Sequence, residues 1–484
     1  MQALKKILLF IIVSATCLSA FGQNNNVPQS TVAVTVKDSS AKIFIKQIIV
    51  KGNQKTKEYI VLREMQFKEG DSIIISTINK ELEQARQQIY NTTLFSEVKL
   101  QVVILSAFEM MVIADVKERW YIYPVPQFKP VDRNFNEWIK TYNASLKRVN
   151  YGLKFVHYNL TGRRDQLRIY FLTGFSRDFS FSYNAPYSNA KLTEGFVVGA
   201  GYSQKKEIAY KSSFNNNLLF YTSDSLRSKF VGSNFYITAG YTLRKGFFNK
   251  HIFNTGFSRL TVSDSILLPK NNPNYFNNGT NAANVFEVSY TYQHVNVNNV
   301  LYATKGKTAF AAISKRGLGF TGGINAVTLE AGINKYYDLG KNWYSNVQLN
   351  GKIRLPLQQS YINQRGLGYG DTYLRGLEYL VIDGVGTALI KSTLKYKVTE
   401  FKIPLPFKIK SLPYIPFTIF AKTYADLGYV YNKKEFTTNL NNKLLYTGGF
   451  GIDILTFYDV NLRLEYSFNQ LNQKGLFLHT QSGF

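Results

Sequence analysis

The sequence has almost no cysteine. Cys17 is the single cysteine among 484 residues. It lies in a segment with the form of an export signal, in which Lys5 and Lys6 precede an apolar run (7–13) and small residues end at Gly22. We predict a signal peptide at 1–22, with cleavage after Gly22 and no lipid on Cys17. The exported chain would then contain no disulfide, so burial or sheet closure must hold it together.

Long apolar runs are also missing after the signal. No later stretch approaches the 18 consecutive apolar residues that a membrane helix requires, although 45% of the residues are hydrophobic and 15% aromatic. If the chain spans a membrane, it must do so with strands. Acidic residues are few, with 31 Asp and Glu against 58 Lys and Arg. The basic residues are spread along the chain rather than clustered, so we expect no nucleic-acid partner and instead a basic lumen or a rim that faces lipid phosphates.

From about residue 150 to Phe484, segments of roughly ten residues carry apolar side chains at every second position. In 459–468, Val460, Leu462 and Leu464 share one face while Arg463 occupies the other. This alternation predicts a transmembrane β-barrel of about 16 antiparallel strands at 151–484, because only a closed sheet pairs every backbone group in lipid. The alternative fold is a soluble β-sandwich. The predicted strands lie near 152–160, 166–173, 178–183, 195–203, 230–243, 249–262, 285–295, 308–315, 326–337, 343–354, 388–398, 417–431, 446–455, 460–468 and 476–484, with a less regular hairpin at 205–221 making up the total.

The segment before the barrel has a different pattern. Residues 23–41 are predicted to be a flexible polar lead, and 42–119 a compact domain in the order β-α-α-β-β. Its second helix, near 77–90, presents one apolar stripe to a three-stranded sheet. We interpret 120–150 as a junction into the barrel, because the prolines between 124 and 130 argue against a strand in a ladder.

These residues carry a resemblance to a known family. The N-terminal domain resembles a POTRA domain in Val50-Lys51-Gly52-Asn53, Arg63-Glu64, Leu94-Phe95 and Val116-Lys117-Glu118-Arg119. The barrel resembles the BamA/TamA surface-antigen family in Leu301–Gly306, Tyr373–Leu377, Gly386-Thr387-Ala388, Tyr424–Tyr431 and the terminal Phe484. The similarity extends from about Lys42 to the end of the chain.

The resemblance implies a sixteen-stranded barrel in the outer membrane of a Gram-negative bacterium, with one POTRA domain in the periplasm. It implies insertion or translocation of polypeptides, with outer-membrane or secreted client polypeptides, lipid and accessory periplasmic proteins or lipoproteins as partners. Because there is room for one POTRA domain only, an accessory or specialised member is favoured. A passive, anion-preferring pore and a secretion channel dedicated to one partner protein remain as alternatives.

Arg375 is the leading candidate for a functional residue. The family motif here places an arginine on a long loop that folds back into the lumen, and Gly376 supplies a turn. A buried guanidinium needs a carboxylate, and alternation along its strand turns Asp426 inward. Glu465 is inward by the same rule and is a weaker candidate. Lys395 stands where the family commonly has an inward carboxylate, which indicates either a more loosely held loop or a specialised protein.

The barrel seam is the second candidate. With the barrel starting at Tyr151, the first strand, containing Tyr151 and Gly152, must pair with the last, from Gly475 to Phe484. A seam that opens would expose backbone groups to an incoming strand. The POTRA sheet edge could bind extended peptides in the same way.

Signals of an enzyme are absent. The four histidines lie far apart on separate predicted strands, so no metal and no cofactor is expected. The Gly366-x-Gly368-x-Gly370 stretch leads into a loop and not a helix, which argues against a phosphate cradle. No nucleophile elbow or paired carboxylates for hydrolysis are found, and we predict a protein without chemical catalysis.

Overall fold

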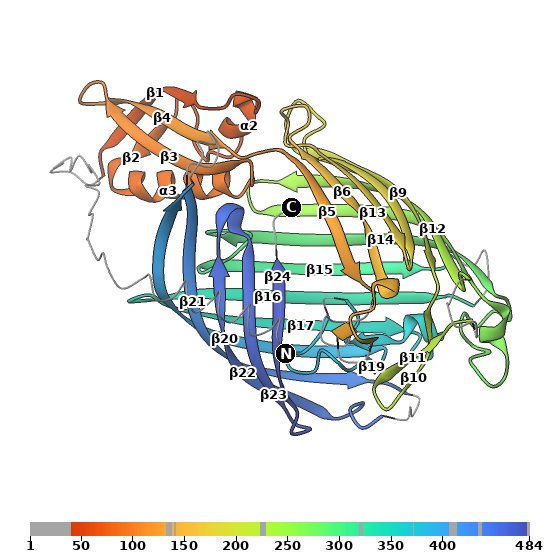
Figure 1. Cartoon of the computed structure of the whole chain (residues 1–484). Coiled ribbons are helices and arrows are strands. Elements are labelled where there is room, and N and C mark those ends of the chain that lie inside the picture. Colours follow the sequence, from red (N-terminus) through yellow and green to blue (C-terminus); the bar gives the residue numbers. More distant parts are fainter. Residues whose placement is uncertain are drawn as a thin grey trace.

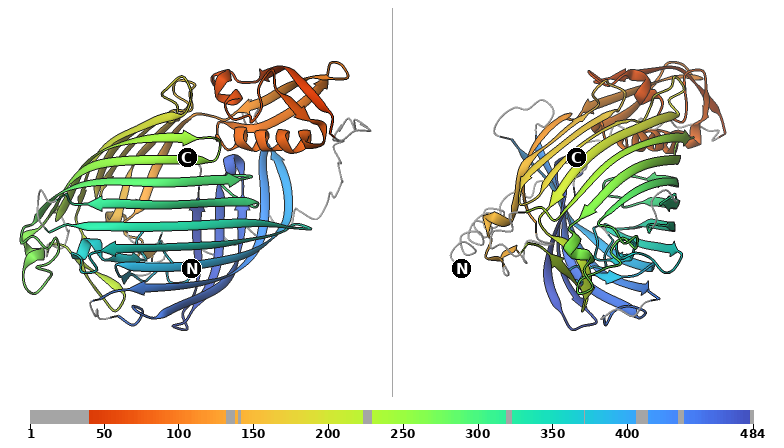
Figure 2. Two further views of the ribbon diagram at one scale, coloured as in Figure 1. Left: turned by 180° about the vertical axis from the view of Figure 1, so that it is seen from behind. Right: turned by 90° about the vertical axis from the view of Figure 1, so that its right-hand side faces the viewer.

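The computed structural model describes residues 40–131, 138–139, 142–222, 229–318, 323–370, 372–405, 414–433 and 438–481. The predicted signal peptide, nearly all of the predicted lead and Phe484 lie outside these residues. The chain forms a small α/β domain that sits against one end of a large, curved antiparallel sheet (Figures 1 and 2). No helix in the described part of the chain is both long and apolar enough to cross a membrane.

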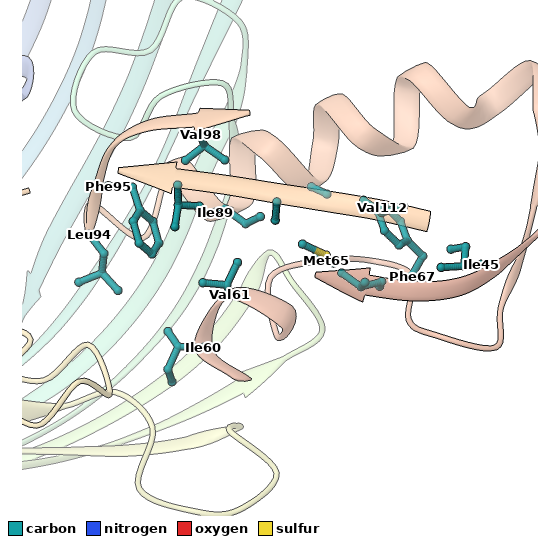
Figure 3. Packing of buried hydrophobic residues seen from close by; sticks show 14 of the residues in the cluster. Ile45, Ile60, Val61, Met65, Phe67, Ile89, Leu94, Phe95, Val98 and Val112 are labelled. Atoms are coloured by element: carbon teal, nitrogen blue, oxygen red, sulfur yellow. The ribbon is translucent and has the colours of Figure 1, made fainter. Parts of the chain in front are cut away.

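The N-terminal domain has the predicted helices and strands plus one short strand. Its sheet has the order β2-β1-β4-β3, so the short strand β2 extends the expected three-stranded sheet at one edge. The apolar stripe of α3 packs on the sheet through Ala85 and Ile89, and Ile45 and Phe95 are fully buried in the same cluster. Figure 3 labels Ile45, Ile89 and Phe95 among the buried side chains of this cluster. The elements are β1 (Lys42–Lys51), α2 (Glu58–Leu62), β2 (Ser72–Ile74), α3 (Ile78–Tyr90), β3 (Phe95–Ile104) and β4 (Glu109–Glu118).

The second part is one sheet of sixteen strands, each hydrogen-bonded to its neighbours in chain order. The strands are β5 (Ile122–Pro130), β6 (Val149–Tyr158), β7 (Gln166–Gly174), β8 (Arg177–Ala185), β9 (Glu194–Lys205), β12 (Gly232–Lys245), β13 (Asn249–Val262), β14 (Ala282–Val297), β15 (Gly306–Arg316), β16 (Ala326–Gly340), β17 (Trp343–Leu355), β20 (Gly386–Pro404), β21 (Tyr414–Tyr431), β22 (Leu444–Leu455), β23 (Asn461–Asn469) and β24 (Lys474–Gln481). The predicted fold class, a sixteen-stranded barrel with one β-α-α-β-β domain, is confirmed.

Two details of the predicted barrel are wrong. The sheet begins at Ile122 and not at Tyr151, because the predicted junction contains β5, which pairs with β6 along its whole length. The predicted hairpin at 205–221 forms β10 (Ile208–Ser213) and β11 (Asn216–Phe220), but these make a separate two-stranded sheet. The missed first strand and the misassigned hairpin cancel, so the total of sixteen is correct.

Side chains alternate along the strands as the sequence predicts. On β21, Asp426 and Tyr424 are buried inside the barrel, whereas Leu427 and Tyr429 are about two-fifths exposed on the outer face. An outer face of apolar side chains and an inner face with buried polar groups is the arrangement of a barrel in lipid. The inner face is therefore where polar chemistry can occur.

Candidate functional site

The loop between β17 and β20 folds back into the barrel. It contains β18 (Arg365–Leu367) and β19 (Ile382–Asp383), which pair with each other. Leu374 and Leu377 of this loop pack in an apolar cluster with Leu389 of β20 and Val430 of β21. Two apolar anchors thus hold the polar segment between them against the inner wall.

Arg375 is placed between these anchors and binds β21. Its Nε donates a 2.8 Å hydrogen bond to Asp426, and its Nη2 donates a second one to the same carboxylate. Nη1 donates to the hydroxyl of Thr393 at 3.0 Å, and Nη2 also donates to the carbonyl of Ser392 at 3.1 Å. The guanidinium lies 4.0 Å from the ring centre of Tyr424. The structure therefore joins the two predicted residues in a bidentate, charge-assisted pair.

Gly376 allows the loop to approach β23 closely. Its φ is +87°, and a Cβ at this position would lie 2.9 Å from the Cβ of Ser467. Its carbonyl accepts a 2.7 Å hydrogen bond from the side chain of Asn469. Both the backbone conformation and the lack of space require glycine here.

Two glycines of β22 let inward side chains of β21 reach β23. In the sheet, Lys422 lies opposite Gly451, which lies opposite Glu465. The side chain of Lys422 crosses this position, and its ammonium lies 2.6 Å from Glu465. In the same way, the hydroxyl groups of Tyr424 and Ser467 meet at 2.5 Å across Gly449, which is paired with both residues.

Glu465 therefore belongs to a network next to Arg375 and does not bind Arg375 directly. Lys422 also contacts Asp453 at 2.5 Å, and the hydroxyl of Tyr302 donates to Asp453 at 2.7 Å. Lys395, at the position where a carboxylate was expected, lies 3.9 Å from Asp453. The carboxylate missing at this position of β20 is thus replaced by Asp453 of β22, two strands away in the sheet. A cavity of about 340 Å³ lies over this network in the lumen.

One histidine meets two carboxylates near the end of the chain. His479 on β24 lies 3.1 Å from Glu378 of the loop and 3.5 Å from Glu465. The three side chains offer ligand atoms within 4.8 Å of one another and could hold a metal ion. However, Glu465 is already paired with Lys422, so the group is accounted for as a link between the loop and the last two strands.

A second buried ion pair fastens the N-terminal domain to the barrel. Glu64, directly after α2, accepts two 2.6 Å hydrogen bonds from Arg244 at the end of β12. The hydroxyl of Tyr187 donates to the same carboxylate at 2.6 Å. Burial alone would raise the pKa of Glu64, but the hydrogen bonds and charge of Arg244 outweigh it and hold this pKa well below its ordinary value. The carboxylate is therefore charged and matched.

Further hydrogen bonds surround this ion pair. Arg63 donates to the carbonyl of Leu192 at 3.1 Å, and Arg164 donates to the carbonyl of Thr92 at 3.0 Å. The side chain of Asn91 donates to the carbonyl of Val297 at 2.8 Å. These contacts involve the barrel turns nearest to the domain in Figure 1, so the domain rests on one mouth of the barrel.

The opposite mouth is covered by the barrel's own segments. Asn215, at the tip of the β10–β11 hairpin, donates to the carbonyl of Val381 at 3.2 Å. Tyr369 and Ser212 both donate hydrogen bonds to the carboxylate of Asp383. The hairpin that the sequence assigned to the wall thus packs on the lumen loop.

The seam lies elsewhere than predicted. Tyr151 and Gly152 are in β6, the second strand, and are paired on both sides, so they do not form the seam. The edge strands are β5 and β24, which contains Gly475. Over the described residues no ladder joins β5 to β24, and their ribbons lie apart in Figure 1.

Sequence reasoning missed several of these groups. Tyr302 and Glu64 lie in motifs that carried the family resemblance, but their partners are 151 and 180 residues away. Lys422 follows the same alternation as Asp426, but its partners required the register of three strands. A usable signal was the pair of glycines at 449 and 451 in β22. They indicate that side chains of the two adjacent strands, both of which carry inward charged residues, can meet across β22.

The N-terminal domain matches a known protein family. Residues 43–119 match the family model POTRA, described as surface antigen variable number repeat. These residues are a POTRA domain. A search of curated proteins gives no significant sequence match.

Solved structures resemble the whole described architecture. CdiB from Escherichia coli matches over 90% of this chain and 75% of its own, with 13% identity and a TM-score of 0.55. BamA from Haemophilus ducreyi lacking POTRA domains 1–3 matches over 91% of this chain and 84% of its own, with 14% identity and a TM-score of 0.48. At this identity the likeness to CdiB establishes a shared fold. The predicted combination of a POTRA domain with a sixteen-stranded barrel is confirmed.

Proposed function

We propose that this protein is an outer-membrane assembly or translocation factor of a Gram-negative bacterium. It would assist the insertion or export of client polypeptides, without chemical catalysis, and its POTRA domain would face the periplasm. The POTRA match and the barrel fold support this proposal. A protein that spans the outer membrane has no use for a docked periplasmic domain unless something is delivered to it from that side.

The observation that carries the proposal is the incomplete seam beside the docked POTRA domain. Strands β5 and β24 share no ladder over the described residues, whereas the other neighbouring strands of the sheet are hydrogen-bonded. An unpaired edge can bind an extended chain through its backbone, whatever the side chains of that chain are. The driving force would come from the client, which buries its apolar face in lipid and satisfies its backbone groups.

The alternative of a passive pore is not favoured. The lumen loop packs against the inner wall, and the β10–β11 hairpin covers one mouth. The POTRA domain rests on the other mouth. Secretion of one dedicated partner would use the same POTRA domain and seam. It differs from general insertion in which proteins disappear from the outer membrane when the seam is cross-linked.

The test is to lock the seam. Ile122 and Thr480 are replaced by cysteine at the POTRA-side ends of β5 and β24 and joined with a bifunctional thiol reagent in cells that carry only this variant. The matched control is Ile313→Cys with Leu329→Cys, which joins two strands that are already paired. We expect the seam lock, but not the control, to deplete correctly folded barrel proteins from the outer membrane.

The proteins that are lost identify the role. Loss of many barrel proteins supports insertion, and loss of one surface protein supports dedicated secretion. Unimpaired assembly and export under complete seam cross-linking would show that the seam is not the route. A large, stable current through the wild-type protein in a planar bilayer, unchanged by Arg375→Ala, would favour the pore.

A further inference from the structure

The first strand of the barrel carries Pro124, Pro126 and Pro130, all at even-numbered positions. Next to the two ends of β5, the amide of Tyr158 donates to the carbonyl of Tyr121 and the amide of Val131 donates to the carbonyl of Arg148. The pairing of β5 with β6 is unbroken between these bonds. In an antiparallel strand, the N–H and C=O of one residue point to the same side, and successive residues alternate. Odd-numbered residues therefore bind β6, and even-numbered residues face the seam.

The seam edge of β5 is consequently poor in donors. Five residues face it, at 122, 124, 126, 128 and 130, and three of them are prolines without an N–H. Only Ile122 and Phe128 carry an N–H, although all five residues have a carbonyl. The carbonyls of Ile122 and Pro126 already accept hydrogen bonds from the side chains of Trp120 and Gln127. A strand added to this edge would leave most of the carbonyls that it turns towards β5 without a donor. In a region without water, each unpaired carbonyl costs free energy.

The edge of β24 is different. At its hairpin, the amide of Asn469 donates to the carbonyl of Gln473, and the pairing with β23 continues without a break to Gln481. Odd-numbered residues of β24 thus bind β23, and even-numbered residues face the seam. These are Lys474, Leu476, Leu478 and Thr480, none of which is proline. Each offers both a donor and an acceptor, so the edge is complete.

We propose that a client strand docks on the edge of β24 and that β5 is a proline-protected edge that rejects it. This inference rests on the proposed function and names the strand that would receive the client. The occupant is an extended polypeptide segment with apolar residues at every second position, in phase with Leu476 and Leu478, which are 60% and 62% exposed. Antiparallel pairing requires the client strand to run from the POTRA side towards the opposite mouth, because β24 runs towards the POTRA side.

Two other occupants of this edge fit less well. The chain's own β5 supplies few donors and lies apart from β24 in Figure 1. A second copy of this protein, inserted in the same orientation, would present a β24 that runs parallel to the first. Antiparallel pairing of the two copies would put one POTRA domain on the wrong side of the membrane.

The test compares the two edges with one probe. The probe is a synthetic peptide with the sequence of β23, residues 461–469, carrying a thiol-reactive group at its centre. It is added to the full chain in lipid nanodiscs, with a single cysteine introduced by Leu478→Cys on β24 or by Phe128→Cys on β5. These two positions are equally exposed, at 62% and 60%. Leu329→Cys, on the fully paired strand β16, measures non-specific labelling.

We expect the Leu478→Cys variant to be labelled at least tenfold faster than the other two, and we expect this advantage to vanish when all amides of the peptide are N-methylated. Equal labelling at both edges, or no effect of N-methylation, would overturn the proposal. Cross-linked dimers of the chain through Leu478→Cys would assign the edge to a second copy instead.

A backbone variant connects the edge to client assembly in cells. Leu478→Pro removes one donor from the free edge and no bond to β23, whereas Leu478→Ala shortens the side chain and keeps the donor. We expect peptide capture and client assembly to fall with proline and to persist with alanine, provided that the proline variant shows the heat-modifiable migration of a folded barrel. If peptide capture follows this pattern while client assembly is unaffected, the edge preference stands and the proposed function fails. If the proline variant does not fold, the nanodisc comparison decides alone.

Discussion

The pair between Arg375 and Asp426 predicts a large, non-additive loss of barrel stability. The Asp426 side chain is fully buried and that of Arg375 is 11% exposed, so neither charge is well hydrated when its partner is removed. Removal of one member of a buried ion pair costs about 3–5 kcal/mol. We expect Asp426→Ala to lie at the lower end of this range, because Arg375 keeps its hydrogen bonds to Thr393 and Ser392.

The double variant removes both charges together. Its loss of unfolding free energy should be smaller than the sum of the two single losses by about 2–3 kcal/mol. Each single variant leaves one buried charge without its partner, whereas the double variant leaves none. The measurement is urea unfolding of the protein in lipid vesicles, followed by tryptophan fluorescence. Faster tryptic cleavage of the loop in the single variants would show that the loss occurs where the pair is broken.

The matched control is an exposed ion pair on the same sheet. Lys397 and Glu400 lie 3.3 Å apart with side chains 30% and 56% exposed. Their alanine variants should cost less than about 1 kcal/mol. Additive losses for Arg375 and Asp426, or losses no larger than those of the control, would show that the loop is held by its apolar anchors and not by the ion pair.

Three further predictions concern single contacts. Glu64→Gln should loosen the contact between the POTRA domain and the barrel, which limited proteolysis would detect as faster cleavage between them. Arg244 lowers the pKa of Glu64 in the folded protein. The wild-type contact should therefore persist above about pH 4 and weaken as the pH falls through this folded-state pKa. Gly376→Ala should destabilise the loop by about 1–3 kcal/mol more than Gly370→Ala, because both have positive φ but only the former meets another strand; equal urea midpoints would contradict this. Lys422→Met should cost about 3 kcal/mol or more in the same unfolding assay, because it leaves two buried carboxylates without their shared cation.

The sequence was sufficient for fifteen of the sixteen strands of the barrel sheet and for the inner position of its charges. Alternation of side chains is a local property of a strand, so the inward direction of Asp426 could be read from its own segment. Asp426 could then be proposed as the partner of Arg375, because it faces inward and the loop motif places the arginine in the lumen. The POTRA elements were equally accessible, because the stripe on α3 repeats within one helix.

The remaining contacts depend on register and on docking, which no single segment encodes. Lys422 reaches Glu465 because the register of the sheet places both residues opposite Gly451. Glu64 meets Arg244 only because the POTRA domain rests on the turns of the barrel. Such pairs join residues far apart in the sequence, and many carboxylates and cations could have been matched before the strands were aligned.

The prolines of β5 show how a correct rule led to a wrong boundary. Proline is excluded from a strand that is paired on both sides, and this argued against a strand at 122–130. The rule has an exception for an edge strand whose prolines all face away from its one partner, and the even spacing of Pro124, Pro126 and Pro130 meets this condition. The spacing therefore carried more information than the presence of proline. Prolines on one side of the first strand keep its ladder to β6 intact and remove donors from the seam, so the chain can fold a stable wall and still leave that seam without full closure.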